Sequence, residues 1–219
     1  MDKHQNVDWS ALHTVEEMRQ LSNLGHWTEG GLFGLIGVIA LLQTFGIIKS
    51  SLALWQSFIL VAGLFLISYL LLHHGIGKVP LVWSLVIKDP QQRQHLLIAL
   101  LLCIAGFAQI LSKVKLIPSL HYGWPLALFL IGVLFLVHEQ HGTSEAVDWA
   151  QRIHRYLGVL LILVSVAFTL DSLFADRCRW LMYTWPSLLI ITAVLLLLYR
   201  EPHGAYEHGQ VNEMKSPHH

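Results

Sequence analysis

The sequence predicts an all-α membrane protein: a bundle of six transmembrane helices, with both termini on the same side and an amphipathic helix at the N-terminus. Three observations support this fold class. Hydrophobic residues make up 54% of the 219 positions. Only 13% of the residues are charged, against roughly a quarter in soluble domains. Six apolar runs approach the roughly 20 residues that a membrane-spanning helix needs.

These six runs divide the chain into three parts. We predict an N-terminal interfacial segment over 1–29, a six-helix transmembrane domain over 30–200 and a flexible polar tail over 201–219. Nucleic acid is not an expected partner, because 14 Lys and Arg residues balance 14 Asp and Glu residues and leave no basic excess. The expected partner of the apolar surface is the lipid bilayer. The spans are predicted at 31–48, 52–72, 96–111, 124–137, 156–174 and 180–199.

Two shorter elements are expected to lie at the membrane surface. Residues 9–24 have helical apolar periodicity, and Thr14 with Glu17 has the spacing of a capping box, so we predict a helix lying on the bilayer. Residues 79–87 are apolar and bounded by Pro80 and Pro90, which indicates a short interfacial or re-entrant segment.

An even number of spans places both termini on one side of the membrane. The short loops of the opposite side are rich in basic residues, which favours that side as cytoplasmic. The face that carries the termini is therefore expected to be extracytoplasmic. The basic residues of the short loops are Lys49, Lys113, Lys115, Arg177 and Arg179.

The 14 histidines are concentrated at one membrane face. On the predicted topology, every histidine except His121 falls on the side of the termini. Histidine is tolerated at membrane interfaces, and this explains the histidines in the loops. It explains the histidines at the ends of spans less well. The histidines at or near span ends are His26, His73, His74, His95, His138, His141, His154 and His203.

The fourth apolar run is too short to cross the bilayer by itself. The helix that contains it must therefore include polar residues beyond the run. Pro125 belongs in a first helical turn, so we expect the helix to extend forward through His138, Glu139 and His141. Two histidines three positions apart on a helix share a face and can hold one metal ion. Ionisable residues at membrane depth are functional candidates.

The sequence therefore predicts a transition-metal site, with copper, iron or zinc as the ion, at the face of the termini. Glu139 is a candidate metal ligand, a hydrogen-bond partner of a ligand or a proton carrier, and His26 could close the site from outside. A single b-type haem is the alternative cofactor, held by His74 or His95 together with His138 or His154. The predicted metal ligands are His73, His74, His95, His138, His141, His154 and Glu139.

Two family resemblances rest on these histidines. Six spans with histidines on the second to fifth are similar to the cytochrome b561 superfamily, but that family divides its haem ligands between both faces, whereas here they lie on one. The segment with His138 and His141, a polar loop, and His154 before Arg155-Tyr156 resembles the transmembrane-45 type of polytopic proteins. That resemblance implies a multi-helix fold with a shared histidine face.

The sequence is compatible with three functions. The first is metal handling or metal-dependent redox chemistry at the histidine site, with a redox or metal-delivery partner. The second is a membrane oxidoreductase that uses a single haem or a diiron centre on quinol or lipid. The third is a non-enzymatic structural or assembly protein whose histidines only form hydrogen bonds.

Overall fold

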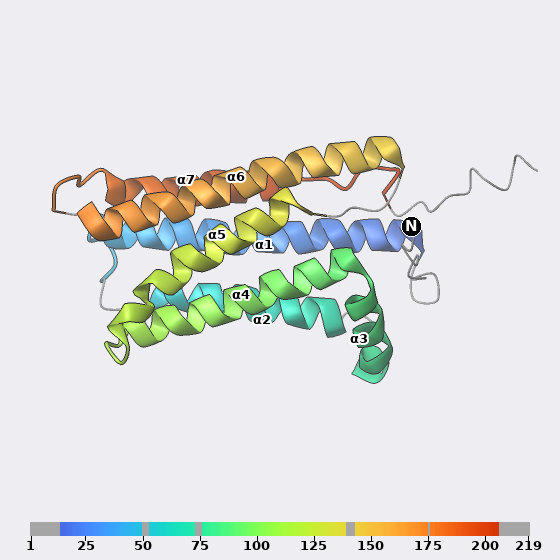
Figure 1. Cartoon of the computed structure of the whole chain (residues 1–219), viewed down its shortest axis with the longest axis horizontal. Helices are drawn as coiled ribbons and strands as arrows, with labels where there is room; N and C mark the ends of the chain where they lie inside the picture. Colours follow the sequence, from blue (N-terminus) through green and yellow to red (C-terminus); the bar gives the residue numbers. More distant parts are fainter. Residues whose placement is uncertain (1–13, 50–52, 73–75, 139–142, 175, 206–219) are drawn as a thin grey trace, which may run out of the picture.

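The computed structural model describes residues 14–49, 53–72, 76–138, 143–174 and 176–205. Regular secondary structure in these residues is helical, and six segments are long and apolar enough to cross a membrane, as predicted (Figure 1). A 3₁₀ helix, η1 (Ile76–Lys78), leads into the shorter helix α3 (Val79–Lys88). The six membrane-length segments are α1 (Val15–Thr44), α2 (Leu54–Leu72), α4 (Pro90–Lys113), η2 (Pro118–Tyr122) with α5 (Gly123–Leu136), α6 (Ser144–Phe174) and α7 (Leu181–Leu198).

Helix α1 begins at the predicted capping box. The Thr14 hydroxyl oxygen accepts a hydrogen bond from the Glu17 backbone N–H at 3.3 Å, and the Glu17 carboxylate accepts one from the Thr14 backbone N–H at 2.8 Å. The helix then runs unbroken to Thr44, because no proline interrupts it. Residues 15–24 are therefore the first turns of a long helix rather than a separate surface helix, and the predicted boundary at 29/30 lies inside α1.

Helix α3 runs across the end of the bundle, beside the end of α2 and the start of α4 (Figure 1). Val82 and Val86 are buried, whereas Trp83 on the same helix is 48% exposed. This division between a buried and an exposed face is typical of a helix at a membrane interface.

Helix α4 starts earlier than the apolar run that predicted it. Asp89 is its N-cap, and the Asp89 carboxylate accepts a hydrogen bond from the Gln91 backbone N–H at 2.9 Å. Pro90 occupies the first turn, where its missing N–H costs nothing. His95 consequently lies inside α4 and not at its first residue.

The prediction that the fourth span continues as a helix through His138 is wrong. Helix α5 ends at Leu136, and His138 follows it in the connection to α6. The span gains its length at the opposite end, where η2 precedes α5 and Pro125 still lies within the first helical turn. His138 therefore does not lie on a helical face that it could share with another histidine.

The helices pack chiefly as three pairs, α1 with α7, α2 with α4 and α5 with α6. The α5–α6 crossing is close, because glycine faces glycine. A Cβ placed on Gly132 would lie 2.8 Å from the Gly158 carbonyl oxygen, and one on Gly158 would lie 2.7 Å from the Gly132 carbonyl oxygen. Small residues at crossings of this kind allow membrane helices to approach closely.

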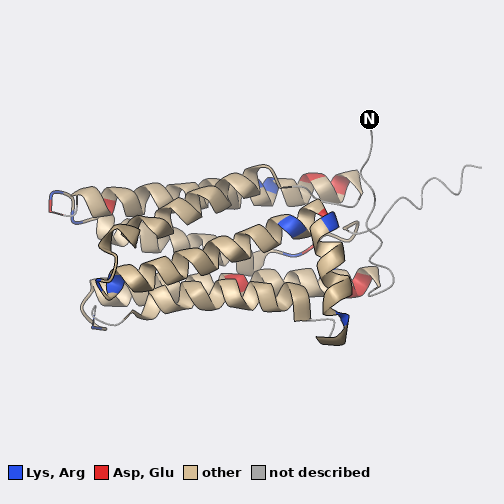
Figure 2. Ribbon diagram, turned by 60° about the horizontal axis from the view of Figure 1, so that its bottom comes forward, with Lys and Arg blue, Asp and Glu red and all other residues tan. Residues whose placement is uncertain are grey.

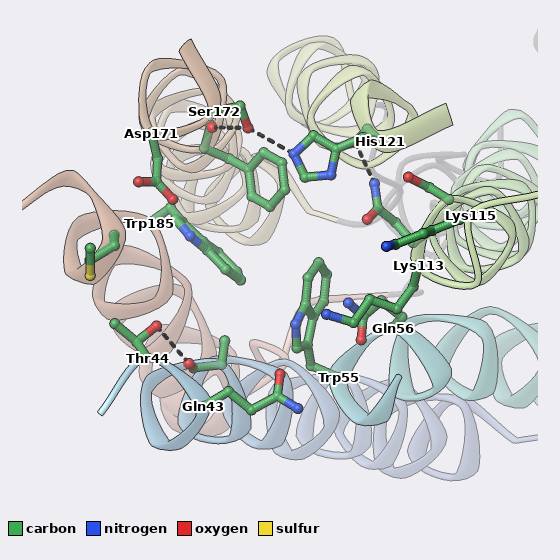
Figure 3. Close-up of a pocket in the computed structure, with 15 residues that line it drawn as sticks. Gln43, Thr44, Trp55, Gln56, Lys113, Lys115, His121, Asp171, Ser172 and Trp185 are labelled. Carbon is green, nitrogen blue, oxygen red and sulfur yellow. Dashed lines mark hydrogen bonds between the residues drawn. The ribbon is translucent and has the colours of Figure 1, made fainter. Parts of the chain in front are cut away.

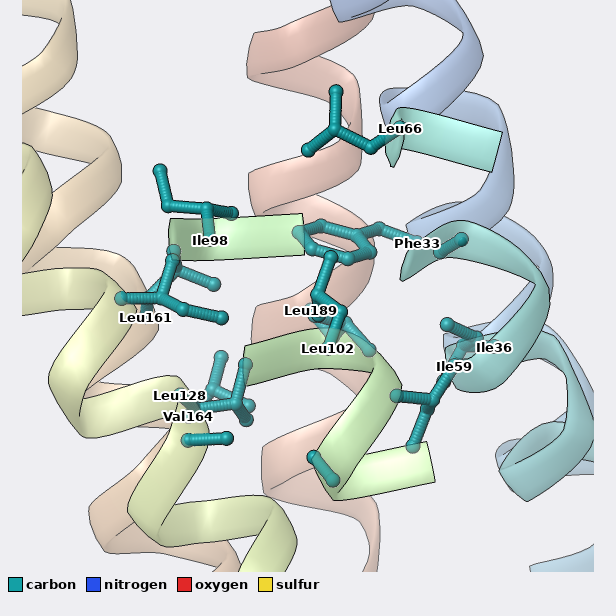
Figure 4. Close-up of a cluster of buried hydrophobic side chains, with 14 of the residues drawn as sticks. Phe33, Ile36, Ile59, Leu66, Ile98, Leu102, Leu128, Leu161, Val164 and Leu189 are labelled. Carbon is teal, nitrogen blue, oxygen red and sulfur yellow. The ribbon is translucent and has the colours of Figure 1, made fainter. Parts of the chain in front are cut away.

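The bundle is apolar both between its helices and on its outer surface. Side chains such as Phe33, Leu102 and Leu161 fill the centre (Figure 4). On the outside, Ile104 is 67% exposed and Leu198 is 71% exposed. Figure 2 shows little charge along the middle of the bundle, with most basic and acidic residues near its two ends. Such a surface suits lipid rather than water.

Candidate functional site

Four histidines from different parts of the chain meet at one end of the bundle. His26 comes from α1, His95 from α4 and His154 from α6, while His138 lies just beyond α5. The ring centroids are 6.0 Å apart between His26 and His154. They are 4.2 Å apart between His154 and His138, and 5.2 Å between His138 and His95. We call these four residues the histidine row.

The histidine row is largely shielded from solvent. His154 is 2% exposed, His138 5% and His26 9%, while His95 is half-buried. Histidine is usually only partly buried, and a buried polar ring needs hydrogen bonds or a bound ion to offset its loss of water.

Hydrogen bonds fix the ring orientation of two members of the row. The Nδ1 atom of His26 lies 2.7 Å from the Ser22 carbonyl oxygen, and Nδ1 of His95 lies 2.9 Å from the Gln91 carbonyl oxygen. A carbonyl oxygen can only accept, so Nδ1 carries the proton in both rings. The Nε2 atom of each ring then holds a lone pair, and this is the tautomer that a metal-binding histidine needs.

His154 is the most deeply buried member of the row. Within the described residues neither of its ring nitrogens has a hydrogen-bond partner of good geometry, and the ring has only a weaker interaction with the Ala150 backbone one turn earlier. The rings of Phe135 and His154 are stacked, with their centroids 5.6 Å apart and an interplanar angle of 9°. A buried polar group left unsatisfied costs roughly 1–3 kcal/mol. His154 is therefore the histidine for which a ligand at the ring nitrogens would bring the largest gain.

A tyrosine and a carboxylate lie beside the row. The Tyr199 ring is 4.3 Å from that of His26 and 6.0 Å from that of His154, by centroids. The Tyr199 hydroxyl donates to the Glu201 carboxylate at 3.1 Å, and the Ser22 hydroxyl donates to the same carboxylate at 2.5 Å.

The sequence did not indicate Tyr199 or Glu201, because both lie at the end of the last span and Glu201 opens the segment predicted as a flexible tail. Glu201 is in fact 5% exposed, and its backbone N–H donates to the Asn23 side chain at 2.7 Å. The pairing of α1 with α7 places this segment against the start of α1. The only sequence feature that could have identified Glu201 as a candidate site residue is its position directly after the end of a span.

The structure brings together three of the predicted ligands and places a fourth histidine beside them. His95, His138 and His154 lie side by side, and His26 belongs to the row itself rather than closing it from outside. The remaining predicted ligands, His73, His74, Glu139 and His141, lie outside the described residues.

Among the described residues, no group of three or more His, Cys, Asp or Glu side chains has the geometry of a metal site. The four rings form a row, not a shell around one centre, so each histidine has one or two neighbours. The donor chemistry nevertheless suits copper, zinc or iron, because the row offers neutral imidazoles and two of them have fixed tautomers.

Comparison of the chain with protein-family models, with curated proteins and with solved structures found no match.

Proposed function

We propose that this chain is an integral membrane protein that binds a transition metal ion at the histidine row, for metal handling or metal-dependent redox chemistry. The observation that carries the proposal is the buried His154, whose ring nitrogens have no hydrogen-bond partner of good geometry in the described residues and whose ring lies between those of His26 and His138. Imidazole nitrogens are common ligands of copper, zinc and iron.

The tautomers of the row support an ion over histidines that only form hydrogen bonds. His26 and His95 each use Nδ1 to donate to a carbonyl of their own helix, which leaves Nε2 as an acceptor. The same arrangement orients metal-bound histidines in proteins and raises their basicity. A structural network would instead be expected to satisfy the ring nitrogens of its most buried member.

An ion also fits the packing better than a haem does. Two axial histidines must lie on opposite faces of the porphyrin. The rings of His95 and His138 have centroids 5.2 Å apart, and the ring of His138 also lies 4.2 Å from that of His154. A macrocycle between His95 and either of these two histidines would have to displace that packing.

Tyr199 supports redox chemistry as the second candidate function. Its ring touches His26, and its hydroxyl is hydrogen-bonded to the Glu201 carboxylate, which can take up the phenol proton. A Tyr199→Phe variant removes this proton donor and keeps the ring. If the protein only binds and passes an ion, the variant keeps both its bound metal and its ability to pass the ion on. If the protein is a redox enzyme, the variant keeps its bound metal but loses the rate of electron transfer to its substrate.

Metal analysis tests the primary proposal. The full chain is purified in detergent, loaded with Cu²⁺ or Zn²⁺, washed and analysed for bound metal. We expect stoichiometric metal in the wild type, loss in His154→Ala and retention in His121→Ala, since His121 lies at the opposite end of the bundle. Equal metal in His154→Ala and wild type, or none in the wild type, would refute the site. An absorption spectrum of the same sample reports any haem.

We also propose that the histidine end faces away from the cytoplasm. The support is the basic character of the opposite end, which carries Lys113, Lys115, Arg177 and Arg179 in short connections. Reporter fusions at the C-terminus that are active on one side of the membrane only would decide the orientation.

A further inference from the structure

A pocket of about 540 Å³ lies at the end of the bundle opposite the histidine row. Its walls come from the last turns of α1, α4 and α6, from the first turns of α2 and α7, and from Lys115 and His121 in the connection between α4 and α5, so it is a gap between helix ends. Its volume lies in the usual range of small-molecule sites. If the six helices span the bilayer, the pocket lies at the depth of the lipid head groups.

Two tryptophans form the apolar part of this pocket. Trp55 and Trp185 are 8% and 6% exposed, and their ring centroids are 5.4 Å apart. Figure 3 shows both rings beside the open centre of the pocket, with the nitrogen of Trp185 turned toward the Asp171 carboxylate. Tryptophan faces attract organic cations, and a carboxylate beside them strengthens that attraction.

Charge is divided across the pocket. Asp171 lies on one side, and Lys113 and Lys115 lie on the other (Figure 3). A ligand that matches both sides carries a cation at one end and an anion at the other. Lysine ammonium groups are good partners for a phosphate.

A buried amide places a further requirement on the ligand of this pocket. Gln56 lines the pocket and is 3% exposed, yet its side-chain oxygen Oε1 has no hydrogen-bond partner within the described residues. An unsatisfied acceptor of this kind calls for an N–H or O–H donor. A primary ammonium supplies such donors, whereas a quaternary ammonium does not.

We propose that this pocket binds a phosphoethanolamine group, with its ammonium at Trp55, Trp185, Asp171 and Gln56 and its phosphate at Lys113 and Lys115. The proposal is independent of the metal site. The group can belong to a phospholipid of the bilayer or to a soluble compound with the same head group.

Native mass spectrometry of the full chain in detergent tests this proposal with three phospholipids that have identical acyl chains. Phosphatidylethanolamine has a primary ammonium, phosphatidylcholine a quaternary one, and phosphatidylglycerol no cation. We expect the first to be retained about tenfold more than the last, since an ionic hydrogen bond is lost. Equal retention of the three lipids, or retention of none, would overturn the proposal.

Variants locate the binding. Asp171→Asn is expected to lower retention of phosphatidylethanolamine about tenfold, and Gln56→Leu to lower it to the level of phosphatidylcholine. Lys113→Met is expected to weaken all three lipids alike. Asp176→Asn and Lys49→Met, which alter charges outside the pocket, are the matched controls. Size-exclusion profiles verify folding, and unchanged retention in both Asp171→Asn and Lys113→Met would contradict the assignment.

A competition arm identifies the source of the group. Glycerophosphoethanolamine is added to the complex with phosphatidylethanolamine. Displacement shows that the soluble head group is sufficient for binding. Persistence of the complex shows that acyl chains contribute and that the ligand is a bilayer lipid.

Discussion

The two ends of this bundle use buried aromatic and polar side chains in different ways. At one end, the imidazoles of the histidine row lie in contact with one another and with Tyr199. At the other end, Trp55 and Trp185 border a pocket of about 540 Å³. His121 belongs to this second end, and its Nε2 is hydrogen-bonded to the Ser172 hydroxyl at 2.9 Å. His154 has no such partner among the described residues.

The same residue type thus has different surroundings at the two ends of one fold. His121 is satisfied by a neighbouring side chain and needs no ligand. His154 is more deeply buried and lacks a hydrogen bond of good geometry, which is costly for a polar ring shielded from water. Four predictions test this difference between the two ends of the bundle.

The largest expected effect is the loss of metal in His154→Ala. Removing the central ring of the row should weaken Cu²⁺ or Zn²⁺ binding by at least about 100-fold, because a direct ligand contributes more than its supporting groups do. Isothermal titration of the detergent-solubilised protein measures the affinity. His121→Ala should bind the ion as the wild type does, and a parallel loss in that variant would erase the distinction between the two ends.

The next effect concerns the crossing that holds His138 and His154 together. Gly158→Ala places a methyl group against the Gly132 carbonyl oxygen, at 2.7 Å. We expect a loss of about 2 kcal/mol in the free energy of unfolding, the usual cost of overpacking. Unfolding in detergent, followed by circular dichroism, provides the measurement. Gly31→Ala is the control, since nothing lies within 4 Å of a Cβ at Gly31, and equal behaviour of both variants would contradict the close crossing.

A smaller effect, on the free energy of unfolding of the metal-free protein, distinguishes a metal ligand from a histidine that only forms hydrogen bonds. In the metal-free protein, His154→Leu should raise the free energy of unfolding by about 1 kcal/mol, because an unsatisfied polar ring is replaced by an apolar side chain. His121→Leu should lower it by about 1 kcal/mol, because a hydrogen bond is lost. Thermal unfolding of both variants in the presence of a chelator tests the pair. Destabilisation by His154→Leu would favour histidines that only form hydrogen bonds.

The smallest effect is expected from Glu201→Gln. The substitution preserves shape but removes the charge that accepts hydrogen bonds from Ser22 and Tyr199. Metal affinity should fall by about tenfold, the lower end of the loss seen for residues that support ligands, because Glu201 bonds Ser22 and Tyr199 and not a histidine of the row. Glu145→Gln, at an exposed position in the first turn of α6, is the matched control. An effect as large as that of His154→Ala would indicate that Glu201 is itself a ligand.

The sequence predicted those features that depend on local pattern. Hydropathy located the six membrane-length helices, and the spacing of Thr14 and Glu17 predicted a capping box, since both signals lie within a few turns of the chain. The helix that begins there was predicted as a separate surface helix and not as the start of the first span. The N-cap Asp89 with Pro90 was also readable and would have placed His95 inside its helix.

Features that depend on long-range packing could not be predicted. The C-terminal end of α5 is one example, because an apolar run does not show whether a helix gains its length before Trp124 or after Val137. The contact of Tyr199 with His26 is another, because it requires α7 to pack on α1. The gathering of histidines at one end was predictable, but their order in a row was not.

X-ray absorption spectroscopy of the Zn²⁺-loaded full chain identifies the atoms bound to the metal and so shows whether the histidine row holds the ion. The metal site proposed at the histidine row predicts nitrogen ligands with the outer-shell scattering of imidazole, reduced in His154→Ala and unchanged in His121→Ala. Zinc surrounded by oxygen atoms alone, or an imidazole signal that His154→Ala leaves intact, would contradict it.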